Sequence, residues 1–529
     1  MNQPQKTDVV ELELFTNRFK AIAEEMGEML RRTAVSTNVK ERLDFSCALL
    51  NASGELVVNA PHMPVHLGAM GLCVRRLTQV ISFAPGDVVV TNHPAFGGSH
   101  LPDITVVTPV FLPNGQLLSY VANRAHHAEI GGTRPGSMPP FATSLAEEGV
   151  VIPPFHLIKA GKPNWRHIQD LLTKGKYPSR TPADNLADLR AAVAANQRGL
   201  SALTTLAEKE STEKVDFYMT ALKKLADMQI REALQQLPDG VYHAQETLDD
   251  GSLLSVKITI SGETAEVDFT GSEDVHPGNL NATEAIVRSV VIYILRLLLD
   301  KPLPLNEGLM GPVKVIVPKG MLNPPFPANT EKAPAVVGGN IETSQRLVNL
   351  LLKALKLCAA SQGTMNNTLF GTEHFGYYET VCGGCGAGPG FHGASATHSH
   401  MTNTRITDPE ILEHRYPVRI ERFSIRQNSG GDGKFHGGNG AIREITFLQK
   451  MKLSILSQNR KHGPFGLDGG KSGKPGKQYL IRASGEIEHL QAIDGRTVYP
   501  GDRFVLETPG GGGYGKPNGL QSSTPFRLK

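Results

Sequence analysis

Two apolar runs separated by an Asn-Gly pair place the strongest constraint on the fold. The runs "ITVVTPVF" (104–111) and "LLSYVANRA" (117–125) are rich in valine, threonine and aromatic residues, and Asn114-Gly115 lies between them. Such a pair between two strand-like runs is a strong signal for a β-hairpin, because both residues accept the positive φ angles of a tight turn. The chain is therefore predicted to form a hairpin here.

Further strand patterns precede this hairpin. In "FSCALLNASGELVV" (45–58) two apolar runs flank a second Asn- and Gly-containing turn, and "GDVVVT" (86–91) adds another apolar run. Short apolar runs bounded by such turn residues are typical of strands. Residues 45–125 are therefore predicted to form a sheet of mostly antiparallel strands.

Helical patterns lie on both sides of this region. An apolar repeat of 3.6 residues runs from Phe15 to Leu30 and predicts an amphipathic helix. Thr181-Pro182 is typical of a helix start, and the Ala- and Leu-rich chain that follows predicts long helices to about residue 237. Two more helices are predicted, at 282–300 and 343–360, between strand patterns such as "LLSVKITI" and "VKVIVP".

The last third of the chain is crowded with glycine. Runs such as "NSGGDGKFHGGNG" (428–440) alternate with strand-like "AIREITFL" and "KLSILS", in which valine, leucine and isoleucine are too frequent for a disordered linker. The predicted fold class is therefore α+β and multi-domain, with mixed, largely antiparallel sheets, long helices and a glycine-rich β-rich C-terminal domain. Three domains are predicted: an N-terminal α+β domain (1–237), a central α+β domain (238–375) and the glycine-rich domain (376–529).

The charge balance excludes two classes of partner. The chain has 54 Lys and Arg against 51 Asp and Glu, so its formal net charge is only +3. Neither a nucleic-acid track nor a polybasic membrane anchor is expected from so small and dispersed a charge. The N-terminus lacks a basic stretch followed by an apolar one, and no run reaches the about 18 apolar residues of a membrane span. A soluble, cytoplasmic protein is therefore expected.

Two further motifs carry little chemistry. The five scattered cysteines fit reduced thiols, and Cys382 and Cys385, although spaced as CxxC, have no second pair to complete a zinc site. "PFGLDGGKS" ends like a phosphate-binding loop but has Phe465 where the first glycine belongs. We interpret both motifs as glycine-rich turns, so the chain is expected to have no nucleotide site of its own.

The residues with the clearest chemistry flank the hairpin at 104–125. His100 and Asp103 precede its first strand, and His126 and His127 follow its second. Neighbouring strand residues point to opposite faces, so one of the two adjacent histidines is expected to share a site with His100 and Asp103. Two imidazoles and a carboxylate are typical ligands of an open catalytic site for zinc, manganese or ferrous iron. The alternative is a hydrogen-bonded loop near the surface.

Other polar residues near these strands are open to two interpretations. Asp44 is a candidate fourth ligand or general base, although a turn or cap aspartate is an equal alternative. His62 and His66 are interpreted as pocket or core histidines, because the proline between them disfavours a helical i,i+4 pair. Glu147 and Glu148 are interpreted as solvated loop acids in preference to substrate contacts or metal-site partners.

Eight sequence blocks, in order, resemble the hydantoinase B/oxoprolinase family over about residues 41–515. The blocks are "ERLDFSCALLNASGELV", "HMPVHLGAM", "GDVVVTNHPAFGGSHLPDITVVTPVF", "ANRAHHAEIGG", "VDFTGS", "VGGNIETSQR", "NSGGDGKFHGGNG" and "TPGGGGYG". The resemblance implies a subunit of an ATP-dependent enzyme that opens a cyclic amide, such as a hydantoin, a lactam or 5-oxoproline. It also implies an obligate partner, the hydantoinase A-type subunit that binds ATP, in a heterotetramer or larger assembly.

The resemblance assigns a divalent metal, zinc or manganese or iron, to residues that match His100, Asp103 and His126, with Asp44 as a further ligand. In the implied mechanism the partner phosphorylates the amide oxygen of the substrate, and a metal-activated water in this subunit attacks the ring carbon. His127 or Asp44 would accept the proton of that water.

Two alternatives remain open at this stage. Within the same family, the chain could be a subunit of an ATP-dependent ketone carboxylase of the acetone or acetophenone carboxylase type. In a different class, it could be a non-catalytic scaffold for the ATPase subunit, with His100 and Asp103 in a structural role. A third, weaker alternative is a metallohydrolase that needs no ATP.

Overall fold

A seven-stranded antiparallel sheet forms the N-terminal part of the protein. The computed structural model describes residues 8–59, 63–301 and 303–517, so His62 lies outside the described residues. The strand order of this sheet is β2-β1-β5-β4-β3-β6-β7. Its strands are β1 (Phe45–Asn51), β2 (Leu56–Asn59), β3 (Val88–Thr91), β4 (Asp103–Phe111), β5 (Leu117–His126), β6 (Phe155–Lys159) and β7 (Lys162–Pro163). The predicted hairpins correspond to β1–β2 and β4–β5, and the expectation of antiparallel strands is confirmed.

Helices cover both faces of this sheet. Phe45, Cys47 and Leu49 point to one face, where they share a core with α1 (Val9–Thr33) and α6 (Pro182–Glu210). Ala48 and Leu50 point to the other face and pack against α3 (Ala69–Thr78). Both faces of the sheet are therefore buried.

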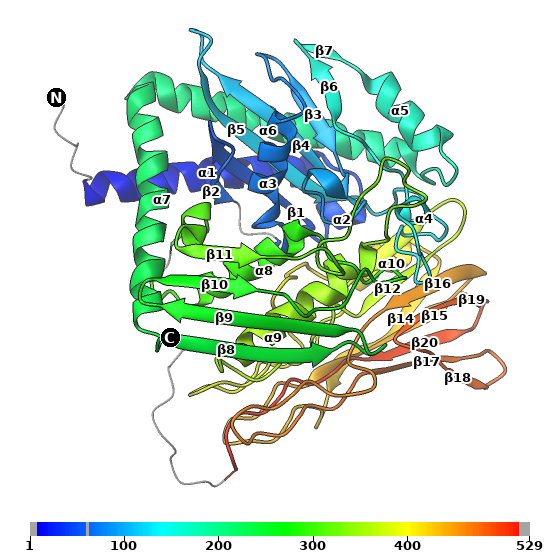
Figure 1. Cartoon of the computed structure of the whole chain (residues 1–529). Coiled ribbons are helices and arrows are strands. Elements are labelled where there is room, and N and C mark those ends of the chain that lie inside the picture. The colour runs from blue at the N-terminus through cyan, green and yellow to red at the C-terminus, as the bar shows by residue number, and fades with distance from the viewer. Residues whose placement is uncertain (1–7, 60–62, 302, 518–529) are drawn as a thin grey trace.

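The two longest helices after the sheet are joined at Ser211. This residue has a φ of 80° and separates α6 from α7 (Thr212–Gln235). Gly199 interrupts neither helix, because it lies inside α6 where a Cβ would come within 2.3 Å of the sulfur of Met26 in α1. Its missing side chain therefore lets α1 and α6 pack closely. In Figure 1, α7 runs along one side of the molecule towards the central sheet.

The central part combines a four-stranded sheet with two buried helices. Its strand order is β11-β10-β9-β8, and β10 and β11 pair in parallel. The elements are β8 (Gly240–Thr247), β9 (Leu253–Ser261), β10 (Thr264–Asp268), α8 (Glu284–Leu297), β11 (Val313–Ile316), the π-helical turn η4 (Gly339–Thr343) and α9 (Ser344–Ala354). The last helix ends before the predicted residue 360, and Lys356, just beyond it, has a φ of 53°.

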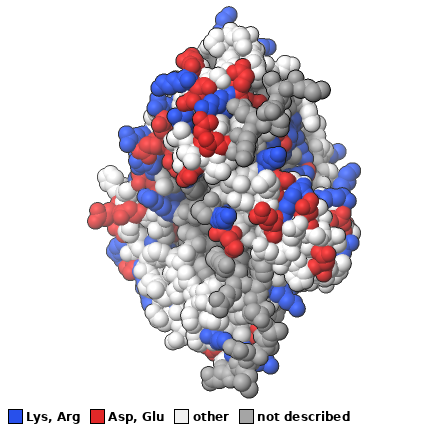
Figure 2. All heavy atoms as spheres, turned by 90° about the vertical axis from the view of Figure 1, so that its left-hand side faces the viewer, with Lys and Arg blue, Asp and Glu red and all other residues white. Residues whose placement is uncertain are grey.

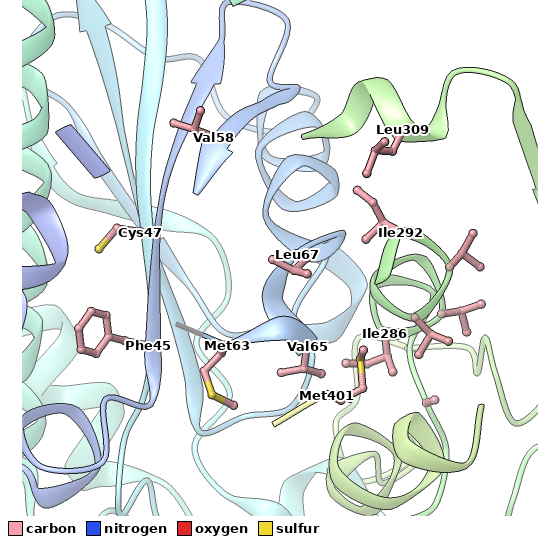
Figure 3. Close-up of a cluster of buried hydrophobic side chains, with 14 of the residues drawn as sticks. Phe45, Cys47, Val58, Met63, Val65, Leu67, Ile286, Ile292, Leu309 and Met401 are labelled. Carbon is pink, nitrogen blue, oxygen red and sulfur yellow. The ribbon is translucent and has the colours of Figure 1, made fainter. Parts of the chain in front are cut away.

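The central part and the N-terminal part share one apolar core. Figure 3 shows Val65 and Leu67, from the segment between β2 and α3, next to Ile286 and Ile292 of α8. All four side chains are buried in the same cluster. This packing fixes the segment that carries His66.

The last third contains two antiparallel sheets, with strand orders β13-β12-β16-β19 and β14-β15-β20-β17-β18. Their strands are β12 (Asn367–Gly371), β13 (Gly376–Glu379), β14 (Val418–Arg426), β15 (Gly440–Phe447), β16 (Met451–Leu456), β17 (Lys477–Ile481), β18 (Ile487–His489), β19 (Ile493–Val498) and β20 (Arg503–Glu507). β12 pairs with β16 across the predicted boundary near residue 375. The exact division into three domains stays a prediction.

The glycine-rich runs pack backbone against backbone. A Cβ on Gly438 would lie 1.9 Å from the carbonyl oxygen of Ala394, and one on Gly511 would lie 1.9 Å from that of Cys385. Side chains cannot fit at such distances, so these glycines allow the close backbone approaches that their density predicts. Shorter helices complete the described chain: α2 (Thr37–Lys40), α4 (Leu145–Glu148), α5 (Trp165–Lys174) and α10 (Pro409–Arg415).

The surface carries charges of both signs. On the face shown in Figure 2, lysine and arginine side chains are interspersed with aspartate and glutamate. None of the helices within residues 8–59, 63–301 and 303–517 has both the length and the apolar character to cross a membrane.

Glu148, interpreted from the sequence as a solvated loop acid, is buried. Its Oε1 accepts hydrogen bonds of 2.8 Å from the backbone N–H groups of Val336 and Val337, whereas Oε2 has no partner. Burial raises the pKa of Glu148 to about 8, although the two backbone N–H groups oppose this shift. Glu148 therefore retains its proton at neutral pH in the folded protein.

This raised pKa predicts a pH-dependent stability. Between the ordinary carboxyl pKa of 4.5 and about 8, folded Glu148 holds a proton that the unfolded chain has lost, so its contribution to stability falls as pH rises. Glu148→Gln removes this contribution. The free energy of unfolding of the variant relative to wild type should rise with pH by up to about 1.4 kcal/mol per unit.

Denaturant unfolding at pH 5, 6, 7 and 8 measures this effect. Glu147→Gln, a change at a partly exposed neighbour, serves as the control and should give a difference that is independent of pH. A pH-independent difference for Glu148→Gln as well would contradict the prediction.

Candidate metal centre

Three of the predicted site residues meet at one end of the β4–β5 hairpin. Asp103 is the first residue of β4 and lies directly opposite His126, the last residue of β5, so both side chains point to the same face. His100 joins them through a turn in which Asp103 N–H donates to the His100 carbonyl at 3.2 Å. One potential ligand atom from each residue lies within 4.8 Å of the other two. The described residues contain no other group of this kind.

The arrangement leaves several buried atoms without hydrogen bonds. His100, Asp103 and His126 are 0%, 0% and 3% exposed, yet His100 Nδ1, Asp103 Oδ1 and His126 Nε2 have no partner. Buried polar atoms without partners are costly and uncommon in folded proteins. A divalent cation would satisfy all three, since imidazole nitrogen and carboxylate oxygen are its usual ligands. The residues therefore fit a metal ion.

Polar and aromatic groups from three other segments hold the two rings. Asn38 of α2 lies 2.9 Å from His126 Nδ1, and Asn340 of η4 lies 3.1 Å from His100 Nε2. Because an amide has both a donor and an acceptor, it can hold either tautomer of the ring it faces. The ring of Tyr378 in β13 stacks on His126, with centroids 4.7 Å apart. Such outer contacts orient the ligands of metal sites.

The electrostatics favour the protonation states that a metal requires. Burial, with His100 nearby, lowers the pKa of His126 well below its usual value. Burial alone would raise the pKa of Asp103, but His100 and His66 outweigh it and hold this pKa well below the ordinary range. A neutral imidazole thus lies beside an ionised carboxylate, which is the combination that binds a cation.

Asp44 lies next to this group but outside it. Its backbone carbonyl accepts the His126 N–H at 2.9 Å, and its side chain is 2% exposed. Burial raises its pKa to about 7, with Arg42 opposing the shift and Asp103 adding to it. Both predicted roles, further ligand and proton acceptor, stay predictions.

His127 points away from the three grouped residues. Its Nδ1 lies 3.1 Å from the amide nitrogen of Asn185 in α6, on the opposite face of the sheet. The structure thus brings together His126, rather than His127, with His100 and Asp103, in line with strand alternation. The proposed role of His127 as a proton acceptor stays a prediction.

The cysteines of the CxxC run lie in the packed glycine-rich region. Cys382 is buried, Cys385 is partly exposed, and both are free thiols. Burial raises the pKa of Cys382 to about 11 and also raises that of Cys385. Thiols with raised pKa values are poor nucleophiles, which favours the interpretation as a structural turn.

Four residues of the site were not identified from the sequence. His66, interpreted there as a core or pocket histidine, lies with Nε2 3.3 Å from Asp103 Oδ2. Asn38, Asn340 and Tyr378 carried no motif that indicates a metal. His66 and Asn340 do fall inside the blocks "HMPVHLGAM" and "VGGNIETSQR", which carry the family resemblance.

Comparisons with known proteins agree with this geometry. 5-Oxoprolinase 1 of Arabidopsis thaliana is 47% identical over 534 residues, which cover 96% of this chain and 42% of the relative. The chain therefore spans about two fifths of the length of that relative. A putative D-/L-hydantoinase B-type subunit of Pseudomonas sp. (strain NS671) is 28% identical and is matched over 91% of its length, as against 97% of this chain.

Two solved structures share the fold. An ATP-dependent caprolactamase from Pseudomonas jessenii superposes with a TM-score of 0.87 and 27% identity, over 97% of this chain and 93% of that chain. An acetone carboxylase in its nucleotide-free form gives a TM-score of 0.85 over 96% of this chain and 76% of that chain, and its 18% identity supports the fold alone. The family model described as hydantoinase B/oxoprolinase matches residues 8–517, so the protein belongs to the hydantoinase B/oxoprolinase family.

Proposed function

We propose that this protein is the metal-binding part of an ATP-dependent enzyme that hydrolyses a cyclic amide. The buried group of His100, Asp103 and His126, with a ligand atom left open on each, is the observation that carries the proposal. The names of relatives, 5-oxoprolinase and ATP-dependent caprolactamase, support the reaction class. The substrate class is a lactam, a hydantoin or 5-oxoproline.

The proposed chemistry divides between two polypeptides. An unstrained amide is a poor electrophile, and phosphorylation of its oxygen by a hydantoinase A-type ATPase would make the ring carbon reactive. A divalent ion, Zn or Mn or Fe, held by His100, Asp103 and His126 supplies Lewis acidity and lowers the pKa of water. Asp44, whose pKa of about 7 suits a general base, accepts a proton at its carboxylate. His127 is the second candidate acceptor.

Chain lengths support a separate partner. This chain covers 91% of the putative D-/L-hydantoinase relative and only 42% of a 5-oxoprolinase. The remainder of the longer relatives would correspond to the ATPase, which we propose to be a second polypeptide here. We further propose a heterotetramer or larger assembly that works in the cytoplasm.

Metal binding is tested by thermal unfolding. Zn²⁺ or Mn²⁺ added to the metal-free protein should raise Tm, since an ion at 100 times its Kd stabilises the folded state by about 2.7 kcal/mol. Asp103→Asn removes the anionic ligand and should abolish most of this increase. The control, Asp250→Asn, changes an aspartate that pairs with His276 instead, and should respond like wild type. Equal increases in all three proteins would contradict the site.

Catalysis is tested with the A-type partner present. ATP hydrolysis stimulated by one lactam, hydantoin or 5-oxoproline, with one ring-opened acid formed per ATP, is the expected result. Asp103→Ala should lose coupled turnover by more than the about 10- to 100-fold that loss of an outer contact to a metal ligand costs. Full turnover by Asp103→Ala would refute the proposal.

The same assay separates the alternatives. Stimulation only by a ketone with bicarbonate would identify a carboxylase. Turnover that is unchanged in His100→Ala, by a protein without bound metal, would identify a scaffold. Ring opening by this chain alone without ATP would identify a self-sufficient hydrolase.

A further inference from the structure

A third histidine, His66, approaches the metal centre from the segment between β2 and α3. Its side chain is 1% exposed, with Nε2 3.3 Å from Asp103 Oδ2. Nδ1 lies 3.0 Å from the hydroxyl of Ser46 in β1. Nε2 has no hydrogen bond of its own, so the carboxylate of Asp103 is the group that it faces.

The hydroxyl of Ser46 determines which ring nitrogen carries the proton. This hydroxyl has two acceptors within reach, His66 Nδ1 at 3.0 Å and the Met63 carbonyl oxygen at 3.5 Å. The shorter contact is the better hydrogen bond, so the hydroxyl donates to Nδ1. A neutral imidazole then carries its own hydrogen on Nε2, next to Asp103.

The two oxygens of Asp103 have different surroundings. Oδ2 accepts a hydrogen bond from Ser99 Oγ and lies 3.3 Å from Nε2 of both His66 and His100. Oδ1, in contrast, has no partner although the side chain is buried. The protein therefore holds one oxygen of this carboxylate and leaves the other open.

We propose that His66 is a positioning residue of the metal centre, which holds Asp103 by Oδ2 and thereby directs Oδ1 at the ion. This role rests on the proposed metal site and extends it to a residue outside the three grouped side chains. Partner groups of this kind orient metal ligands, and their loss typically costs about 10- to 100-fold in metal affinity.

The ring of His66 is itself held rigidly enough for this role. Val65 and Leu67, on either side of it, are buried against α8 (Figure 3). Ser46, which contacts its Nδ1, lies in β1 opposite Arg124 of β5. Arg124 in turn donates to Thr105 in β4 at 2.8 Å. The contact from Ser46 through His66 to Asp103 thus links β1 to β4 on the face that carries the metal centre.

Two substitutions distinguish a positioning residue from a ligand or a space-filling residue. His66→Leu removes the N–H donor, whereas His66→Gln can place an amide N–H near the position of Nε2. The affinity of the full chain for Zn²⁺ is measured by competition with a chelator of known affinity. We expect an affinity about 10- to 100-fold weaker for His66→Leu and within about threefold of wild type for His66→Gln.

A matched control lies in the same sheet. His156 in β6 has the same contact with Asp87, 3.3 Å from Nε2 to Oδ2, outside the metal centre. His156→Leu should therefore bind Zn²⁺ like wild type. Ser46→Ala, which removes the hydroxyl that sets the tautomer, should weaken binding less than His66→Leu and provides the test if His66→Leu fails to fold.

The outcomes separate this role from the proposed function. Wild-type affinity in both His66→Leu and Ser46→Ala overturns the positioning role alone. Equal loss in His66→Leu and His66→Gln, with a changed absorption spectrum of the Co²⁺-substituted protein, makes His66 a ligand and also overturns it. Absence of Zn²⁺ binding in the wild type refutes the metal site and this role together, whereas rescue by glutamine supports both.

Discussion

The antiparallel register of β4 and β5 is the constraint on which the candidate site depends. Asp103 and His126 lie opposite each other in this register, and a slip by one residue would send one of the two side chains to the other face. Burial prevents such a slip, because both faces of the sheet are covered by helices. Arg124 reinforces the register, since its guanidinium donates to Thr105 in β4 and to the Gly97 carbonyl beyond β3.

The centre is assembled from segments far apart in the chain. Asn38 lies near the N-terminus, Asn340 comes from the central part and Tyr378 from β13 in the last third. Arg42 links two of these segments, because its buried guanidinium donates to the Tyr378 carbonyl at 2.7 Å and lies over the Tyr378 ring. Packing between the parts of the protein therefore determines the orientation of the two histidine rings.

This assembly explains how much could be predicted from the sequence. The hairpin and its metal ligands were predictable because turn residues and strand alternation act over a few positions, and these signals are local in Asn114-Gly115 and in His126. Asn340 and Tyr378 could not be recognised, since nothing local distinguishes them from ordinary polar and core residues. His66 was misinterpreted for a related reason: the proline before it excludes a helical pair, but its contact with Asp103 depends on tertiary packing. Glu148 was placed in solvent because its partners, Val336 and Val337, are nearly two hundred positions away.

The position of Glu148 also connects the stability of the fold to the geometry of the centre. Its carboxyl holds the backbone of Val336 and Val337, and the chain then enters η4, whose Asn340 reaches His100. The π-helical turn is an unusual conformation that often occurs at functional sites. It begins at Gly339, where a Cβ would lie 1.8 Å from the Asn281 carbonyl oxygen, so the turn can form only because this residue lacks a side chain. A buried, protonated carboxyl and a glycine thus set the position from which Asn340 holds one ring of the centre, which is why the block "VGGNIETSQR" belongs to the site although it contains no metal ligand.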